Sequence, residues 1–295
     1  MKKTKGLIIA SFFAIYLIWG STYLFNKVAV TELSPLFLAS VRFLTAGILI
    51  MIIAKLLKAS LVITKKELIN SIIAGFLFLV YGNGVFVWAL KYVDSGFAAL
   101  LASTQPLFVL FLMRLIDRKP LQKKSIIGVS LGILGMYLLV SQQEITTSKE
   151  SLLGIFMIFT CVFSWSYGSL FVSKAALPKN FFVSTGYQML SAGAILAIAS
   201  LSFNEVWLSP LEWSFNVRVC MFLLIVLGGI IAFTAFNYLL KVVSTEKVST
   251  SAYVNPVVAL FLGWYVLDEK LTTQSIFASI IILTGVYFIT SRKRR

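Results

Sequence analysis

Histidine is absent from the 295 residues, and only 11 residues are acidic. A chain without histidine lacks the commonest metal ligand, proton shuttle and general base in proteins. Zinc peptidases, histidine-dependent acyltransferases and Ser-His-Asp hydrolases are therefore excluded. The two cysteines, Cys161 and Cys220, both lie in apolar runs without metal-ligand spacing, so no disulfide framework is expected. The sequence predicts no catalytic residue, no metal and no cofactor.

Charge is also scarce, at 13% of the residues, whereas 59% are hydrophobic and the mean hydropathy is +0.93. A soluble domain carries about 25% charged residues because water must solvate its surface. A chain this apolar cannot cover a globule with polar side chains, so lipid must be the solvent for much of it. The composition therefore predicts an all-α integral membrane protein with little room for an extramembrane domain.

Apolar runs separated by short polar breaks predict ten transmembrane helices. Most of the runs approach the roughly 20 residues that a helix needs to cross the hydrocarbon core. The first follows Met1-Lys2-Lys3-Thr4-Lys5 and has no small-x-small cleavage site, so we expect an uncleaved span rather than a secretory signal. The expected spans are residues 6–26, 35–57, 69–90, 96–116, 125–140, 152–172, 181–203, 219–240, 250–266 and 275–289.

Cations are distributed unevenly among the expected loops. With the N-terminus in the cytoplasm, most of the 26 Lys and Arg residues fall on the cytoplasmic side, and this bias predicts that both termini are cytoplasmic. It also accounts for the net charge of +15 without nucleic acid as a partner. The C-terminal Arg292-Lys293-Arg294-Arg295 is interpreted as a cytoplasmic stop that can contact anionic lipid. Membrane lipid and a small-molecule substrate are the expected partners, and the oligomeric state is left open between monomer and dimer.

The two halves of the chain repeat each other. Trp19-Gly20-Ser21 matches Tyr167-Gly168-Ser169, and Gln105-Pro106 matches Asn255-Pro256, in the same order along both halves. Because each half has five expected spans, an odd number, the second half must enter the membrane inverted. Inverted repeats are typical of secondary transporters, whose substrate site lies near the midplane between the copies. We therefore expect two inverted five-helix domains, residues 1–146 and 147–295.

These motifs resemble a known family. Together with Arg42-Phe43-Leu44-Thr45-Ala46 and the segment from Asn255-Pro256 to Glu269, they are similar to a ten-helix, EamA-like member of the drug/metabolite transporter superfamily. The resemblance implies transport of small metabolites or drugs, often export, across the cytoplasmic (inner) membrane of a bacterium. The chain departs from the family at Arg118-Lys119-Pro120, where a glutamate is usual, so the resemblance implies no ionic contact there.

Four amides and four aromatic residues are the candidate substrate-binding residues. Gln105 and Asn255 each precede a proline, whose missing N–H weakens the helix and frees a carbonyl one turn earlier. An amide at such a kink can hold a polar solute or satisfy that carbonyl, and both roles stay open. The aromatic residues form two matched pairs that can be membrane-interface anchors, gate plugs or walls of a site for an uncharged, zwitterionic or aromatic solute. The candidates are Trp19, Asn83, Trp88, Gln105, Tyr167, Asn237, Tyr238 and Asn255, with Pro106 and Pro256 as gating or structural residues.

Arg42 is the only charged residue that falls well inside an expected span. An arginine there costs about 2.5–3.5 kcal/mol on insertion scales, so it should face protein or water. Two roles stay open: a structural one, with pairing to loop carbonyls or an acidic residue, and a role in gating or substrate attraction.

Gly128-Val129-Ser130-Leu131-Gly132 matches the G-x-S-x-G hydrolase pattern, but it lies within a span of a chain without histidine. The same glycines allow close helix packing, within the fold or between protomers.

Energy coupling is constrained by the acidic residues, none of which falls in the apolar centre of a span. Proton-coupled transporters usually carry an intramembrane acid or histidine, so we expect facilitation or weak coupling rather than a carboxylate relay. The sequence has no P-loop for ATP. The predicted function is a secondary transporter, an exporter or facilitator of amino acids or drugs working by alternating access. A non-transporting membrane scaffold or receptor is the alternative, and a membrane-embedded lipid enzyme is a weaker one.

Overall fold

The computed structural model describes residues 2–89, 92, 98, 101–118, 120, 122–141, 149–267 and 271–291. Within these residues every regular element is a helix, which confirms the all-α prediction. Lys119, Glu269 and the four C-terminal residues named above lie outside the described residues.

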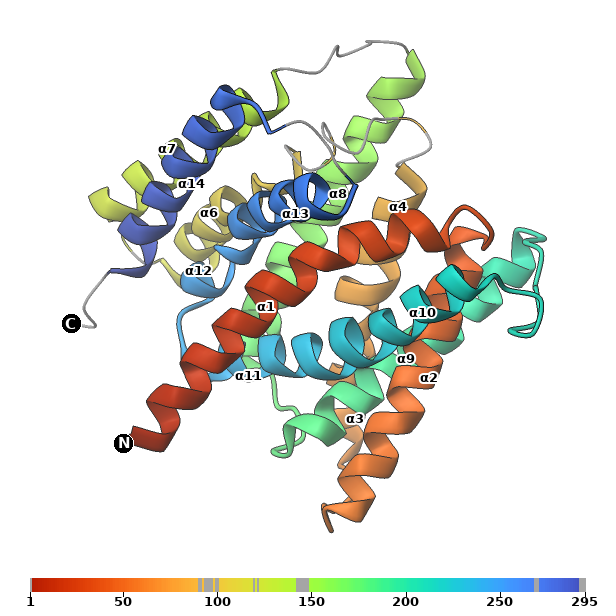
Figure 1. Ribbon diagram of the computed structural model, residues 1–295. Helices are drawn as coiled ribbons and strands as arrows, with labels where there is room; N and C mark the ends of the chain where they lie inside the picture. The colour runs from red at the N-terminus through yellow and green to blue at the C-terminus, as the bar shows by residue number, and fades with distance from the viewer. Residues whose placement is uncertain are drawn as a thin grey trace.

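The helices run along the chain with short connections (Figure 1). The first half contains α1 (Lys2–Ala29), α2 (Pro35–Leu56), α3 (Lys65–Gly75), the π-helix η1 (Phe76–Val85), α4 (Phe86–Ala89), α6 (Gln105–Asp117) and α7 (Lys123–Val140). The second half contains α8 (Lys149–Lys174), α9 (Phe181–Ser202), α10 (Phe215–Leu223), the π-helix η2 (Leu224–Phe233), α11 (Thr234–Val242), α12 (Thr245–Val248), α13 (Ser251–Leu267) and α14 (Thr273–Thr290). The elements α3–η1–α4 and α10–η2–α11 each form one continuous rod.

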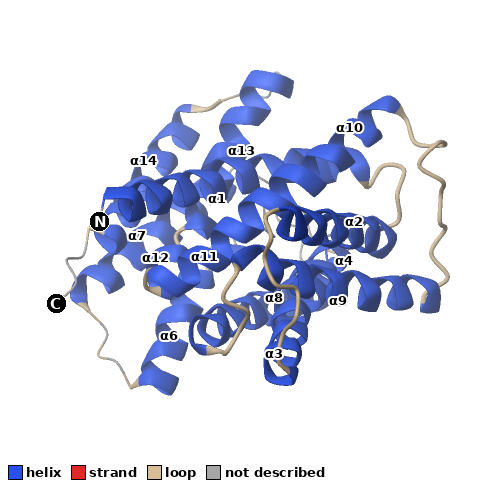
Figure 2. Cartoon of the chain, turned by 90° about the horizontal axis from the view of Figure 1, so that it is seen from below, coloured by secondary structure: helices blue, strands red, loops and turns tan. Residues whose placement is uncertain are grey.

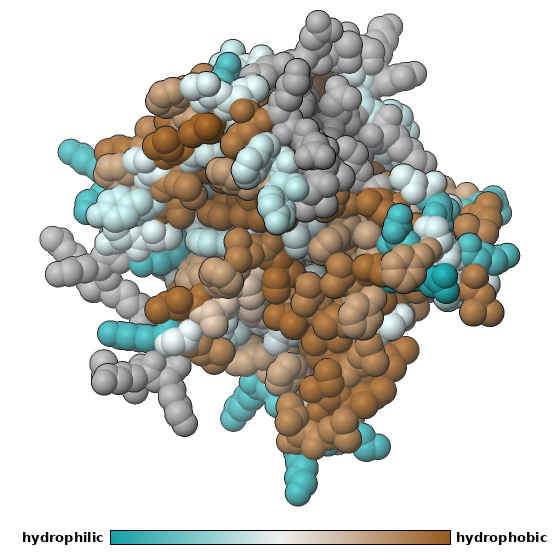
Figure 3. All heavy atoms as spheres, viewed as in Figure 1, coloured by the Kyte–Doolittle hydropathy of each residue, from teal (hydrophilic) through white to brown (hydrophobic). Residues whose placement is uncertain are grey.

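Seven of these rods are long and apolar enough to cross a membrane. They coincide with seven of the ten expected spans, and α6, α7 and α13 fall within or near the other three. Apolar side chains cover much of the face in Figure 3, whereas the hydrophilic ones gather at the margins. A surface of this kind is suited to lipid rather than water, so the chain is a multi-pass membrane protein. The seven segments are Lys5–Asn26, Pro35–Leu56, Lys65–Ala89, Ser151–Lys174, Phe181–Ser202, Phe215–Val242 and Thr273–Thr290.

Helices α2 and α9 pack against each other through reciprocal contacts of small and large residues. A Cβ added to Gly47 would lie 2.9 Å from Leu190 Cγ, and one added to Gly193 would lie 2.7 Å from Leu44 Cγ. Each glycine therefore receives a leucine of the facing helix, as in other membrane helix pairs that approach through small residues.

Helices α7 and α14 form a second reciprocal pair, on the opposite side of the bundle from α2 and α9 (Figures 1 and 2). A Cβ added to Gly128 would lie 2.7 Å from the Gly285 carbonyl, and one added to Gly285 would lie 2.6 Å from the Gly128 carbonyl. Gly132 faces the ring of Tyr253 in α13, which would lie 2.4 Å from a Cβ there. Of the two roles left open for the G-x-x-x-G glycines, packing within the fold is the one that the structure supports.

Two connecting segments cap each other's helices at one end of the bundle. The N-cap residue of α2 makes no side-chain capping bond, and the Glu205 carboxylate instead accepts hydrogen bonds from the N–H groups of Leu36 (3.2 Å) and Phe37 (2.7 Å). Glu32 in turn accepts from the Ser214 N–H (3.0 Å) at the start of α10. Hydrogen bonds from the Ser214 side chain and backbone lower the pKa of Glu32. Both carboxylates satisfy N–H groups that a helix start leaves open.

Replacement of Glu205 by glutamine should weaken this capping. Glutamine removes the negative charge from the N-terminus of α2 and one of its two acceptor oxygens, so we expect a loss of about 1 kcal/mol of unfolding free energy. The control is Glu212→Gln, because Glu212 accepts from Ser209 in its own segment and, among the described residues, caps no membrane-spanning helix. Thermal unfolding in detergent micelles measures both variants, and equal stabilities would contradict the capping role.

Candidate functional site

Five aromatic rings from five elements form a contiguous cluster between the two halves of the chain. The Trp19 ring of α1 lies 5.9 Å from the Trp165 ring of α8 and 5.0 Å from the Phe236 ring of α11. Phe78 of η1 lies 5.0 Å from Trp165 and 5.4 Å from Phe236, and Phe233 of η2 stacks on Phe236 at 6.2 Å. We call these five residues the aromatic cluster.

Each of the two tryptophans contacts a glycine of a π-helix. The Trp19 indole N–H donates to the Gly228 carbonyl of η2 at 3.3 Å, so its polar atom is satisfied away from water. Gly82 of η1 faces Trp165, whose ring carbon Cε3 would lie 2.9 Å from an added Cβ. Two π-helices therefore bring α1 and α8 together around the cluster, which agrees with the frequent placement of π-segments at functional sites.

A buried amide network lies beside the aromatic cluster. The Gln188 amide of α9 donates to the Ser184 hydroxyl (3.1 Å) and to the Asn237 carbonyl oxygen (3.2 Å). The Asn237 amide donates to the Phe233 carbonyl (3.1 Å) and to the Thr185 hydroxyl (3.5 Å). Asn237, a candidate substrate-binding residue, is thus occupied in joining α11 to α9.

We expect Asn237→Leu to destabilise the protein. The substitution leaves the Gln188 amide with one partner fewer in a buried place, and an unsatisfied buried polar group costs about 1–3 kcal/mol. Chemical unfolding of the purified variant in micelles checks this value. An unchanged midpoint would show that the network contributes nothing to stability.

Gln105 and Asn255 are also buried amides, but unlike Asn237 each has a side-chain polar atom that is not hydrogen-bonded to any described residue. Gln105 is 9% exposed and Asn255 is 7% exposed, yet Gln105 Nε2 and Asn255 Oδ1 have no hydrogen-bond partner in the part of the chain that the structure describes. An unpartnered polar atom away from water is costly, so each is available to a solute or a water molecule.

The two prolines that follow these amides differ in placement. Pro256 lies inside α13, as expected for a kink. Pro106 instead lies in the first turn of α6, which begins at Gln105, so it does not interrupt that helix. A proline is tolerated there because the first N–H groups of a helix have no internal partner.

The ring contacts of Trp88 and Tyr238 are with phenylalanines outside the aromatic cluster. Trp88 contacts the Phe203 ring at 4.6 Å and Tyr238 contacts the Phe181 ring at 5.2 Å. These two contacts lie at opposite ends of α9, since Phe181 begins that helix and Phe203 follows its last residue. Asn83 is half-buried in η1, and Tyr167 is 41% exposed.

Trp165, Phe78, Phe236 and Gln188 were not among the sequence candidates. The repeat matches Trp19 to Tyr167, but the ring of α8 that reaches the cluster is that of Trp165. Two residues along an α-helix are a rotation of about 200°, so the two side chains point to opposite faces. The sequence carries no signal that favours Trp165 over Tyr167, because apolar residues are spread around all faces of α8.

Comparison with known proteins identifies the family. The model of the EamA-like transporter family matches residues 5–141 and 152–291. The chain belongs to this family. It is 35% identical over 287 residues to the Escherichia coli (strain K12) protein named uncharacterized inner membrane transporter YedA, covering 97% of this chain and 91% of YedA.

Two more distant relatives support this EamA-like assignment, and a solved structure shares the fold. The chain is 22% identical to the uncharacterized transporter YoaV of Bacillus subtilis (strain 168), with 96% of each protein covered. It is also 22% identical to the probable amino-acid metabolite efflux pump of Salmonella typhimurium, covering 92% of this chain and 91% of the pump. A solved crystal structure has a TM-score of 0.82 over 96% of both chains at 17% identity, which shows the shared fold. The EamA-like protein is therefore a membrane transporter and not an enzyme.

Proposed function

We propose that this EamA-like protein is a secondary transporter of small metabolites, such as amino acids or drugs, that works by alternating access. Ten membrane-spanning helices form two inverted five-helix repeats, residues 1–146 and 147–295. The solute binds between the repeats, beside the aromatic cluster and the unpartnered amides of Gln105 and Asn255.

The reciprocal packing of α2 on α9 and of α7 on α14 is the observation that carries this proposal. In a contact across a twofold axis, residue i of one copy meets residue j of the other, and j meets i. The Gly47–Leu190 and Gly193–Leu44 contacts have this form. The ten-residue π-helices η1 and η2 also fall at equivalent places in the two halves. Two equivalent halves can exchange conformations and so expose one site to either side.

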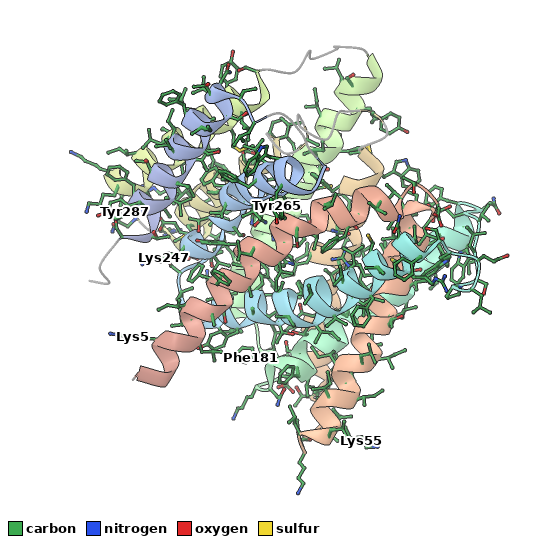
Figure 4. The ribbon with its side chains drawn as sticks, viewed as in Figure 1. Lys5, Lys55, Phe181, Lys247, Tyr265 and Tyr287 are labelled. Carbon is green, nitrogen blue, oxygen red and sulfur yellow. The ribbon has the colours of Figure 1, made fainter. Side chains whose placement is uncertain are left out.

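The orientation in the membrane follows from the positions of the lysines. Lys5 and Lys247 lie on the left in Figure 4, the side on which both termini are drawn in Figure 1, and Lys55 lies at the bottom. Lysine-rich ends face the cytoplasm, so we place both termini there and the protein in the inner membrane of a bacterium. Phe181 lies in the same lower part of Figure 4, which makes the Tyr238–Phe181 contact the cytoplasmic gate and Trp88–Phe203 the outer gate.

The substrate range and the energy source follow from the lining groups. Aromatic rings and amides suit an amphipathic solute, and the name of the Salmonella relative supports metabolite efflux. Transport is facilitated diffusion or is weakly coupled, because no acidic residue lies in the centre of an expected span.

Release from proteoliposomes tests the proposal. Vesicles containing the purified protein are loaded with a metabolite mixture, and the solutes released over time are measured by mass spectrometry. Selective release of some solutes, compared with protein-free vesicles, is the expected result. Release equal to that of protein-free vesicles for every solute would contradict it and favour a non-transporting membrane protein.

A further inference from the structure

Arg42 in α2 is a buried cation without a counter-ion. Its side chain is 6% exposed, and it forms no ion pair or hydrogen bond with the residues that the structure describes; its Nε is buried without a partner. The one charge-related contact of its guanidinium is with the neighbouring Phe43 ring, at 4.9 Å. A buried charge is ordinarily paired, because removing it from water is costly.

The two carboxylates that cap the starts of α2 and α10 are already engaged. Glu205 caps α2 through the N–H groups of Leu36 and Phe37, which lie more than one helical turn from Arg42. Glu32 accepts from Ser214. Neither of these two carboxylates therefore forms an ion pair with Arg42.

The surroundings of Arg42 connect it to the aromatic cluster. Gly228 of η2 lies against both Arg42 and Thr22 of α1: an added Cβ would lie 3.3 Å from Arg42 Nη2 and 3.1 Å from Thr22 Cγ2. The carbonyl of the same Gly228 accepts the hydrogen bond from Trp19. A cation and an aromatic ring thus meet at one glycine, between helices of the two halves.

We propose that Arg42 binds the carboxylate of the transported solute, so that the solutes are small carboxylates or zwitterions whose apolar part lies against Trp19. This inference rests on the proposed transport function. A guanidinium can donate two parallel hydrogen bonds to a carboxylate, and the ion pair supplies the counter-charge that the described residues do not give Arg42. Because a buried cation without a counter-ion is energetically unfavourable, pairing with the solute carboxylate relieves this cost and so favours binding.

The other half of the chain shows that a neutral side chain fits at this position. Arg42 lies two residues before Leu44-Thr45-Ala46-Gly47, and Gln188 lies two residues before the matching Leu190-Ser191-Ala192-Gly193. Gln188 is fully buried in α9 and is hydrogen-bonded to Ser184 and Asn237. Arg42→Gln is therefore a substitution that the fold should accept, and it removes the charge alone.

The test compares acids with their uncharged-carboxyl analogues in the same vesicles. Proteoliposomes are loaded with the twenty common L-amino acids and their carboxamides, and release is measured by mass spectrometry after subtraction of protein-free vesicles. We expect wild-type protein to release at least one amino acid about tenfold faster than its carboxamide. Arg42→Gln should abolish that preference. Arg42→Lys should retain part of it, because an ammonium keeps the positive charge but cannot donate two parallel hydrogen bonds to one carboxylate. Arg218→Gln, which removes an exposed cation, should behave as wild type.

Stability separates a binding role from a structural one. Loss of an unpaired buried charge should leave the Tm of Arg42→Gln equal to or above that of wild type, and the preferred amino acid should raise the Tm of wild type only. A less stable or unfolded Arg42→Gln protein would show a structural arginine and overturn the inference, as would unchanged acid preference in that variant.

The two proposals can fail separately in these vesicles. Wild-type protein that releases metabolites or carboxamides without preferring any acid would leave transport intact and overturn the carboxylate site. Wild-type protein that releases no solute from this mixture or from the metabolite mixture would overturn the transport function itself, and the carboxylate site with it.

Discussion

Replacement of Gly285 by leucine should prevent the protein from folding stably. An added Cβ would lie 2.6 Å from the Gly128 carbonyl oxygen and 3.0 Å from the Gly132 nitrogen. Both atoms belong to the backbone of α7, so no side chain can rotate away and α14 must move as a whole. Overpacking costs about 1–3 kcal/mol where side chains can adjust, and we expect a loss of at least about 3 kcal/mol here.

Gly6→Leu is the matched control for this substitution. Among the described residues, no atom outside the local helix lies within 4 Å of a Cβ placed on Gly6, and the residue is exposed near the start of α1. The yield of monodisperse protein in detergent and its unfolding midpoint should fall sharply for Gly285→Leu and stay unchanged for Gly6→Leu. A stable Gly285→Leu protein would mean that α7 and α14 can pack at a greater distance.

The all-helical fold and its long spans were predictable because lipid leaves few choices. A backbone in hydrocarbon must satisfy its own hydrogen bonds, so an apolar run of about 20 residues becomes a helix. Residues 181–203 were expected as a span on this ground, and α9 occupies Phe181–Ser202. The π-helical stretches within two of the rods were not predicted, since apolar composition is the same in α- and π-helices.

The site was less predictable because it depends on which face of each helix meets a neighbour. Four amides were equally good candidates in the sequence, yet Asn237 is held by three neighbouring residues whereas Asn255 retains an unpartnered oxygen. Nothing local distinguishes them; the difference arises from Gln188, which α9 brings to Asn237 from a distant part of the chain. Trp165 shows the same limit, since its contact with Trp19 depends on the rotation of α8.

A double substitution of Gln105 and Asn255 by leucine should strongly reduce transport while leaving the protein folded. Each amide keeps one polar atom buried without a partner, so its removal relieves a desolvation cost rather than breaking a bond. We expect an unfolding midpoint equal to or above that of wild type. Solute release from proteoliposomes should fall at least about tenfold, since a lost hydrogen bond to a buried solute group costs of the order of 1–3 kcal/mol.

Asn237→Leu completes the comparison, because the same chemical change is made at an amide that the fold uses. That variant should lose stability, whereas the Gln105/Asn255 double variant should lose only transport. Natural proteins commonly keep destabilising groups where function requires them, so opposite effects of one substitution type distinguish a binding amide from a structural one. If the double variant transports normally, the two amides do not contact the solute. If it unfolds as readily as Asn237→Leu, their polar atoms contribute to the fold and the binding role fails.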